Sequence, residues 1–188
     1  MIPPAELLPD LDQVHAERFE AFRSPNWPAL AEAGVHIRFD RSAILPHRVG
    51  PLVVHDRMDD RVAVVRLFPG ISGAWVRHAL EMPGLRAAVL TTFGSGNGPT
   101  DRAFISALEE ARSRGVVLLN ATQCIGGRVE QGRYVTSQAF VEMGVVPCAD
   151  MTVEATLTKA MHVLARNSAE AAVARAMMVP LAGEMSEG

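Results

Sequence analysis

From Arg61 onward, short runs of apolar, largely β-branched residues alternate with longer segments whose apolar residues recur at helical spacing. Strands are predicted at residues 62–68, 87–91 and 116–119. Helices are predicted at residues 71–82, 101–114, 137–143, 152–166 and 169–178. A β-α-β-α-β order implies parallel strands joined by right-handed crossovers. The pattern therefore predicts an α/β fold, with a parallel sheet in a three-layer, Rossmann-like domain.

The first 60 residues have a different composition, because prolines interrupt them repeatedly. After Ser24, Pro25 and Pro28 exclude both a regular helix and a central strand, since proline removes a backbone donor and clashes with the preceding turn. Short strands are predicted only at residues 35–39 and 52–55. We therefore divide the chain into an N-terminal extension and connector over residues 1–60 and an α/β domain over residues 61–188.

Composition narrows the possible partners. The 188 residues carry a net charge of −3 without any charged block, and the arginines are scattered, so neither a nucleic acid nor a membrane partner is predicted. Cys124 and Cys148 form no CxxC or Cys/His cluster, and the six histidines lack ligand spacing, so no metal site is predicted. No secretory signal pattern begins the chain, which favours a cytoplasmic protein.

A glycine-rich turn over residues 92–100 ends one predicted strand and opens the next helix. In open α/β sheets, ligands bind at the carboxyl ends of the strands, which places this turn at the ligand edge. Asn97 either contacts a ligand, held out by the flanking Gly96 and Gly98, or only tolerates a left-handed turn conformation. The turn lacks the GxGxxG pattern, so no dinucleotide and no other cofactor is predicted.

Thr122 and Cys124 follow the strand predicted at residues 116–119, so they also lie near this edge. They either line a ligand pocket, or the hydroxyl satisfies loop backbone and the cysteine is a small buried hydrophobe. Either could serve as a nucleophile only beside an activating base, and no histidine has a suggestive spacing to Cys124. No catalytic residue is therefore predicted. Asp150 is expected to cap the following helix, with Thr152 as the alternative cap.

Several segments, in this order, together resemble the C-terminal domain of type I, cytoplasmic-type L-asparaginases. The resemblance runs from about Phe19 to about Met185 and includes the turn around Asn97. Its segments are FEAFRSPN at residues 19–26, LFPGI at 67–71, the turn at 92–100, TQC at 122–124, GVV at 144–146, residues 150–159 and LAGEM at 181–185.

This resemblance implies hydrolysis of L-asparagine to L-aspartate and ammonia through an acyl-enzyme formed by a threonine. The family's catalytic threonines, aspartate and lysine lie in an N-terminal domain with a TGGT-like segment and a Thr-Asp segment. The only Thr-Asp pair here, Thr100-Asp101, belongs to the glycine-rich turn, and the only lysine, Lys159, matches a C-terminal helix position. The chain is therefore expected to be the second half of an asparaginase, inactive without its catalytic domain.

Site residues follow from the same resemblance. The family's equivalent of Asn97, next to Gly96, reaches across a dimer interface and helps to hold substrate in the neighbouring active site. Bacterial members also have an allosteric asparagine site, whose threonine and cysteine match Thr122 and Cys124. The arginine of that site corresponds to Thr91, which cannot make a charged bidentate contact. Implied partners are L-asparagine as substrate or effector, a second copy of the chain, and a separate N-terminal catalytic domain.

Two functional hypotheses remain open at this point. The chain is either an asparaginase half that supplies substrate-supporting residues, or a non-catalytic dimer that binds a small amino acid or acts as a scaffold. An asparaginase half without its partner domain would expose apolar surface around Phe19, Phe22 and Trp27, and such surface promotes association.

Overall fold

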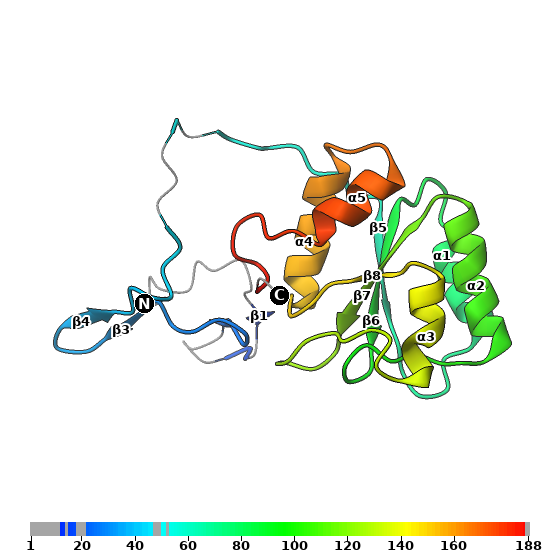
Figure 1. Cartoon of the computed structure of the whole chain (residues 1–188), viewed down its shortest axis with the longest axis horizontal. Coiled ribbons are helices and arrows are strands. Elements are labelled where there is room, and N and C mark those ends of the chain that lie inside the picture. Colours follow the sequence, from blue (N-terminus) through cyan, green and yellow to red (C-terminus); the bar gives the residue numbers. More distant parts are fainter. Residues whose placement is uncertain (1–11, 14, 18–21, 47–49, 52, 187–188) are drawn as a thin grey trace.

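A parallel four-stranded sheet forms the centre of the computed structural model, which describes residues 12–13, 15–17, 22–46, 50–51 and 53–186 (Figure 1). The strands run in the order β5-β6-β7-β8. Their bounds are β5 Val62–Arg66, β6 Ala87–Thr92, β7 Val117–Thr122 and β8 Val146–Pro147. The predicted parallel sheet is confirmed. The two-residue β8 was not predicted, because so short a strand has no periodicity of its own.

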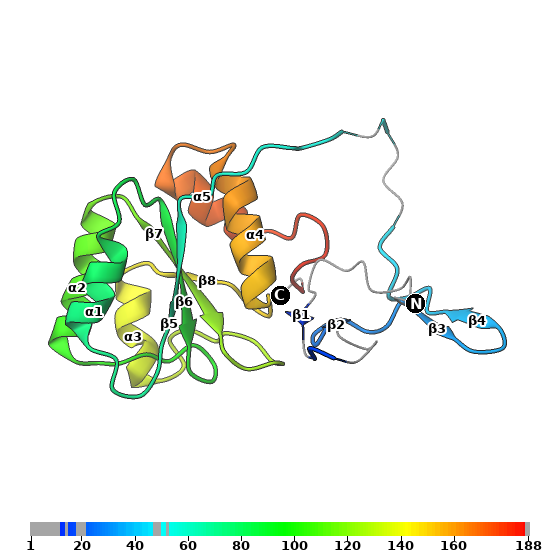
Figure 2. The same cartoon turned by 180° about the vertical axis from the view of Figure 1, so that it is seen from behind.

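Helices cover both faces of the sheet and complete the three layers (Figures 1 and 2). Those that connect successive strands lie on one face: α1 Gly73–Leu80, α2 Arg102–Ser113 and α3 Val135–Glu142. The two that follow β8 lie on the opposite face: α4 Val153–Leu164 and α5 Glu170–Met177. Asp101 caps α2 by accepting a hydrogen bond from the backbone N–H of Phe104 at 3.0 Å. Four helices lie within the ranges that their apolar periodicity predicted, whereas α3 begins two residues before the predicted range of 137–143.

Alternating side chains of the strands build two apolar cores, one on each face of the sheet. On the first face, strand residues pack with the buried rings of Phe104 and Phe140, whose centroids are 6.4 Å apart. On the second face, strand residues pack with Met151, Val163 and Met177 beneath α4 and α5. Because both faces are covered, β6 and β7 are buried along their whole length, which explains their continuous apolar runs.

The N-terminal part forms two small antiparallel pairs away from the main sheet (Figure 1). β1 Asp12–Gln13 pairs with β2 Phe22–Arg23, and β3 Ala31–Ala33 pairs with β4 Ile37–Phe39. The strand predicted at residues 35–39 is therefore the second arm of a hairpin. The strand predicted at residues 52–55 is wrong for residues 53–55, which form no strand, while Leu52 lies outside the described residues.

The predicted apolar surface around Phe19, Phe22 and Trp27 lies mostly outside the described residues. Phe19 and the side chain of Phe22 are not among them, and Trp27 is half-buried, with its indole N–H donating to the carbonyl of Ala43 at 3.2 Å. The β3–β4 hairpin exposes three further apolar side chains, Val35, Ile37 and Phe39, with exposed fractions of 97%, 58% and 62%.

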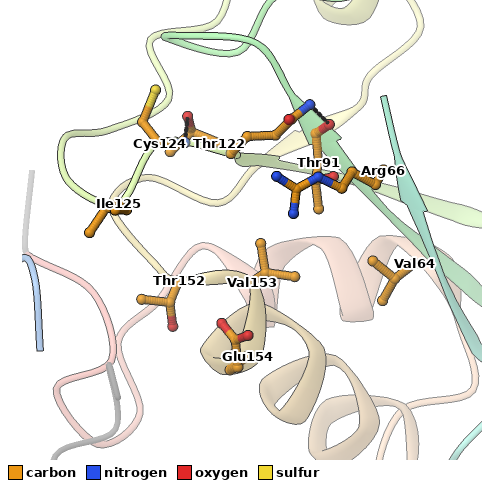
Figure 3. A pocket seen from close by; sticks show the side chains of 10 residues that line it. Val64, Arg66, Thr91, Thr122, Cys124, Ile125, Thr152, Val153 and Glu154 are labelled. Atoms are coloured by element: carbon orange, nitrogen blue, oxygen red, sulfur yellow. Dashed lines mark hydrogen bonds between the residues drawn. The ribbon is translucent and has the colours of Figure 1, made fainter. Parts of the chain in front are cut away.

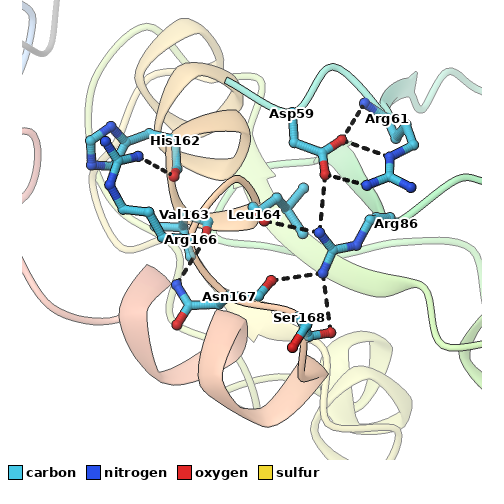
Figure 4. Close-up of polar contacts among 9 residues, drawn as sticks. All are labelled: Asp59, Arg61, Arg86, His162, Val163, Leu164, Arg166, Asn167 and Ser168. Atoms are coloured by element: carbon cyan, nitrogen blue, oxygen red, sulfur yellow. Dashed lines mark hydrogen bonds and ion pairs between the residues drawn. The ribbon is translucent and has the colours of Figure 1, made fainter. Parts of the chain in front are cut away.

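A cluster of polar contacts around Arg86 holds the amino edge of the sheet (Figure 4). The Arg86 guanidinium donates to the backbone carbonyls of Leu164, Asn167 and Ser168 at 2.7–3.1 Å, just beyond α4. A cation suits this position, since the last carbonyls of a helix carry partial negative charge. Arg86 also donates to Asp59 at 3.0 Å, so a single side chain ties α4 to the segment that enters β5.

Asp59 is nearly buried, with its side chain 9% exposed. The Arg61 guanidinium donates two hydrogen bonds to this carboxylate, at 2.8 and 2.7 Å, and holds the pKa of Asp59 well below its usual range. The Arg86 hydrogen bond lowers the same pKa further. A depressed folded-state pKa means that the carboxylate stabilises the fold above the unfolded pKa of about 4 and loses this effect as the pH falls through the folded value.

We therefore predict that Asp59→Asn lowers the free energy of unfolding at pH 7 by about 1–2 kcal/mol, since it removes the charge that both guanidiniums bind. The difference from wild type should shrink as the pH falls below about 4, because the unfolded wild-type chain then binds a proton at Asp59 that the folded carboxylate does not yet bind. Urea unfolding followed by circular dichroism at several pH values measures both effects.

The neighbouring Asp60→Asn provides a matched control, because Asp60 is exposed and its carboxylate makes no hydrogen bond or ion pair within the described residues. It should change the free energy of unfolding by less than about 0.5 kcal/mol. A loss in Asp59→Asn that stayed constant from pH 7 to pH 3 would contradict the assignment to the charge.

Candidate functional site

The glycine-rich turn closes tightly after β6. Phe93 and Asn97 pair through two backbone hydrogen bonds of 2.9 Å, which makes residues 93–97 a short reversal of the chain. Gly94 and Gly96 have φ angles of 51° and 107°, so glycine supplies the left-handed conformations of the turn. Among the described residues, Ala149 is the only non-glycine residue with positive φ, so Asn97 does not serve as a left-handed turn residue.

Asn97 is half-buried at the top of this turn. Its side-chain oxygen accepts a hydrogen bond from the hydroxyl of Thr136, in α3, at 2.7 Å. Its side-chain nitrogen makes no hydrogen bond within the described part of the chain. The carboxamide is therefore oriented by α3 and keeps its donor group available.

Gly96 cannot be replaced without displacing its surroundings. A Cβ atom at this position would lie 2.7 Å from Val129 Cγ1 and 3.0 Å from the side-chain nitrogen of Asn120. The carbonyl of Gly96 accepts a hydrogen bond from that nitrogen at 3.1 Å. Position 96 therefore requires glycine for a steric reason, because the turn can pack against Asn120 and Val129 only without a side chain here.

Asn120, in β7, holds the turn by donating a hydrogen bond to the carbonyl of Gly96. The sequence analysis did not identify Asn120 as a site residue. Its fully buried carboxamide accepts from the hydroxyl of Thr92 at 2.7 Å and donates to Gln131 at 2.9 Å. Gln131 in turn donates to the carbonyl of Val145, next to β8, at 2.9 Å. The signal that could have identified Asn120 is its position, a polar residue directly after an apolar strand run at residues 116–119.

A second group of predicted residues lines a pocket of about 200 Å³ at the same edge of the sheet (Figure 3). The structure brings together Thr91, Thr122 and Cys124, which lie apart in the sequence, but neither Gly96 nor Asn97 lines this pocket. Residues that had not been assigned to it also line it: Val64, Arg66, Gln123, Ile125, Thr152, Val153 and Glu154. The predicted site residues therefore fall into two places, the turn and the pocket.

The hydroxyl of Thr122 already has a structural role. It donates to the carbonyl of Gly94 at 2.6 Å and accepts from the backbone N–H of Cys124 at 3.0 Å. No histidine lines the pocket beside Thr122 and Cys124. Cys148 is fully buried, and desolvation raises the pKa of its thiol to about 12, so this thiol stays protonated at neutral pH. Neither cysteine has the activating base that a nucleophile needs.

The expected helix cap at Asp150 is wrong, because the alternative, Thr152, takes that position. The Thr152 hydroxyl accepts from the backbone N–H of Ala155 at 3.2 Å and caps α4. Asp150 instead accepts from the backbone N–H of Ser186 at 2.9 Å and so holds the C-terminal segment. In the sequence, the side-chain oxygens of Asp150 and Thr152 both lie at a distance before α4 that suits a helix cap. Only the path of residues 179–186, which brings the backbone N–H of Ser186 to Asp150, shows that Asp150 has a different role.

Lys159 is also committed to the C-terminal segment. Its ammonium lies 2.6 Å from the carboxylate of Glu184, and both side chains are almost completely buried. The ammonium donates to the carbonyl of Val179 at 2.7 Å, while Glu184 accepts from the backbone N–H groups of Leu181 and Ala182. The two buried charges compensate each other, and the ion pair holds residues 179–186 against α4.

Within the described ranges, no group of three or more His, Cys, Asp or Glu side chains could hold a metal ion. No helix in the same ranges is long and apolar enough to cross a membrane.

Comparison with known proteins shows the family. The sequence model of the Glutaminase/Asparaginase C-terminal domain matches residues 61–177. The chain belongs to the glutaminase/asparaginase family. It is 43% identical over 174 residues to L-asparaginase 1 of Escherichia coli (strain K12), covering 93% of this chain and 51% of that protein. It is 40% identical over 177 residues to the human 60 kDa lysophospholipase, covering 93% of this chain and 30% of that protein.

The structural comparison agrees with this assignment. The crystal structure of L-asparaginase I from Vibrio cholerae superposes with a TM-score of 0.87 at 36% identity, covering 95% of this chain and 54% of that one. Both the family resemblance and the α/β fold class are thereby confirmed. This member of the glutaminase/asparaginase family spans about half the length of the asparaginase relatives it matches.

We predict that Asn120→Ala lowers the free energy of unfolding by about 1–3 kcal/mol, because it removes the buried carboxamide together with its hydrogen bonds to Thr92, to the carbonyl of Gly96 and to Gln131. Chemical denaturation of the two proteins gives the difference directly. Gln138→Ala is the matched control, since this exposed amide reaches only Glu142, at 3.4 Å. A change of less than about 0.5 kcal/mol in Asn120→Ala would refute a stabilising role for the network.

Proposed function

We propose that this chain is the C-terminal half of an L-asparaginase, which hydrolyses L-asparagine to L-aspartate and ammonia together with a catalytic domain outside these 188 residues. The observation that carries the proposal is the match to E. coli L-asparaginase 1, which extends over 93% of this chain but only 51% of that protein. The division into a connector over residues 1–60 and a domain over residues 61–188 is part of the same proposal.

Side-chain chemistry in the described residues supports an auxiliary role. Amide hydrolysis by an acyl-enzyme route needs a nucleophile with an adjacent base, and neither the turn nor the pocket holds such a pair. By the family resemblance, a threonine of the N-terminal domain would attack the side-chain amide, ammonia would leave, and water would release aspartate. This chain would then contribute binding groups instead of the reacting atoms.

Asn97 is the group that we assign to substrate support. Its carboxamide stands on a turn fixed by Gly96 and by Asn120, and its nitrogen has no partner in the described structure. Such an oriented donor could hold a carboxylate or carbonyl oxygen of a substrate bound by a neighbouring domain.

We also propose that two copies of the chain associate, because the β3–β4 hairpin displays Val35, Ile37 and Phe39 to solvent. Exposed apolar side chains on adjacent positions promote association. A cytoplasmic location is proposed from the family resemblance alone. A concentration-independent monomer in light scattering would argue against the association.

A non-catalytic amino-acid-binding or scaffold dimer is the second candidate. The observation in its favour is that the chain has a pocket lined by Thr91, Thr122 and Cys124 but no nucleophile paired with a base in that pocket or in the turn. On this view the pocket alone would be functional, and adding a catalytic domain would produce no hydrolysis.

The deciding experiment supplies the chain with an N-terminal catalytic domain. We predict that the purified chain alone releases no ammonia from L-asparagine. When the chain is mixed with or fused to the N-terminal domain of an L-asparaginase, the assembly should release ammonia. In that assembly, Asn97→Ala should lower kcat/KM at least about tenfold, because it removes an oriented substrate contact. Ammonia release measured against substrate concentration gives both quantities.

Ser95→Ala is the matched control, because it changes a neighbouring side chain in the same turn while leaving the backbone bond from Glu130 to Ser95 in place. It should retain wild-type kcat/KM. Turnover by the chain alone would overturn the proposed division of labour. A folded assembly without turnover would favour the second candidate.

A further inference from the structure

A pair of histidines joins the segment that enters β5 to helix α4. His55 lies in that segment, and His162 lies in the last turn of α4. Their ring centroids are 5.7 Å apart and the ring planes are perpendicular, which is a common geometry for rings in contact. In Figure 1 the segment is drawn in cyan and passes the end of α4 before it reaches the sheet. The contact therefore fastens the chain to α4 just before the α/β domain begins.

Two hydrogen bonds to backbone carbonyls hold the same segment, and we call its residues 55–58 the strap. The backbone N–H of Asp59 donates to the carbonyl of Met161 at 3.0 Å. The Arg166 guanidinium donates to the carbonyl of Arg57 at 3.4 Å. The paired carboxylate of Asp59 anchors one end of the strap (Figure 4). The other end depends on the long hydrogen bond to Arg57 and on the two histidine rings.

The surroundings of the His162 imidazole carry more positive than negative charge. Arg166 lies at the same end of α4 (Figure 4), and His55 approaches from the strap. Glu184, from the C-terminal segment, lines a pocket with His162, but its carboxylate is paired with Lys159 at 2.6 Å. The imidazole makes no hydrogen bond in the part of the chain that the structure describes. Nothing in this environment therefore favours a proton on the ring strongly.

The neutral imidazole is the form that fits this environment. Desolvation lowers the pKa of His162, and the charges of Arg166 and His55 lower it further, against the opposing effect of Glu184. A ring whose pKa is lower when the strap is docked binds fewer protons in that state. Docking is therefore most stable above about pH 6.5, where the undocked ring is also neutral, and it weakens as the pH falls below that value.

We propose that His55 and His162 form a pH-sensitive latch, which holds the strap against α4 at neutral pH and releases it when both imidazoles are protonated. Each protonated ring would then lie beside the other and beside the Arg166 guanidinium, and like charges at this distance repel one another. Asp56 and Arg57, which follow His55, carry opposite charges that offset each other. Histidine suits this role, because its charge changes between pH 5 and pH 8. The proposal does not rest on the proposed asparaginase function.

The latch sets how the N-terminal part is attached to the α/β domain. The chain runs from β4 through the strap into β5. With the strap docked, this path is fixed along α4, whereas after release the chain is held only from Asp59 onward. A fall in pH would therefore loosen the attachment of the β3–β4 hairpin, which carries the exposed side chains of Val35 and Phe39.

The test is nitrogen-15 relaxation NMR of the purified 188-residue chain at pH 8 and at pH 5. The backbone amides of the strap should have order parameters of about 0.85 at pH 8 and below about 0.6 at pH 5. His162→Phe keeps a ring on α4 but cannot be protonated, so its strap should stay ordered at both pH values. His55→Phe, at an exposed position, makes the same test if His162→Phe does not fold. His36→Phe, in the exposed hairpin, is the matched control and should respond as wild type does.

The amides of β6 provide the internal reference, because this strand is buried along its whole length and should stay ordered throughout. A strap that is equally ordered at pH 8 and pH 5 would contradict the latch, as would one that is already disordered at pH 8. Equal release in wild type and in the folded phenylalanine variant would also refute it. Loss of order that included β6 would indicate general acid unfolding and would exclude a local latch.

Discussion

The buried carboxamide of Asn120 is the interaction on which the ligand edge of this domain depends. From the central strand β7 it reaches Thr92 at the end of β6, the carbonyl of Gly96 in the glycine-rich turn, and Gln131 in the following loop. A fully buried amide must have its hydrogen bonds satisfied, so its three partners are held in place together. The turn that carries Asn97 is therefore tied directly to the sheet beneath it.

Two groups of candidate site residues share this edge and differ in their chemistry. The turn presents one oriented carboxamide, Asn97, on a backbone that only glycine can form at Gly96. The pocket presents opposite charges on facing walls, with Arg66 on a strand and Glu154 on a helix. Thr122 links the two regions, since its hydroxyl binds the carbonyl of Gly94 while the residue lines the pocket. At the opposite edge, the charges of Arg86 and Asp59 are paired with each other.

The position of the pocket arginine illustrates a property of parallel sheets. Adjacent strands bring residues that are far apart in the sequence, such as Arg66 and Thr91, to equivalent positions on one face. Such a pairing cannot be read from positions along the chain, because it depends on strand register.

By itself, the sequence determined the parallel α/β fold, the bounds of β6 and α2 to within a residue or two, and the position of the glycine-rich turn around Asn97, because apolar periodicity and glycine positions are local properties. Tertiary structure alone decided which distant residues meet. It placed Arg66 beside Thr91, gave the cap of α4 to Thr152 instead of Asp150, and added β8 to the edge of the sheet. These outcomes depend on strand register and on the path of the C-terminal segment, which are set by packing between elements and leave no periodic signal in the chain.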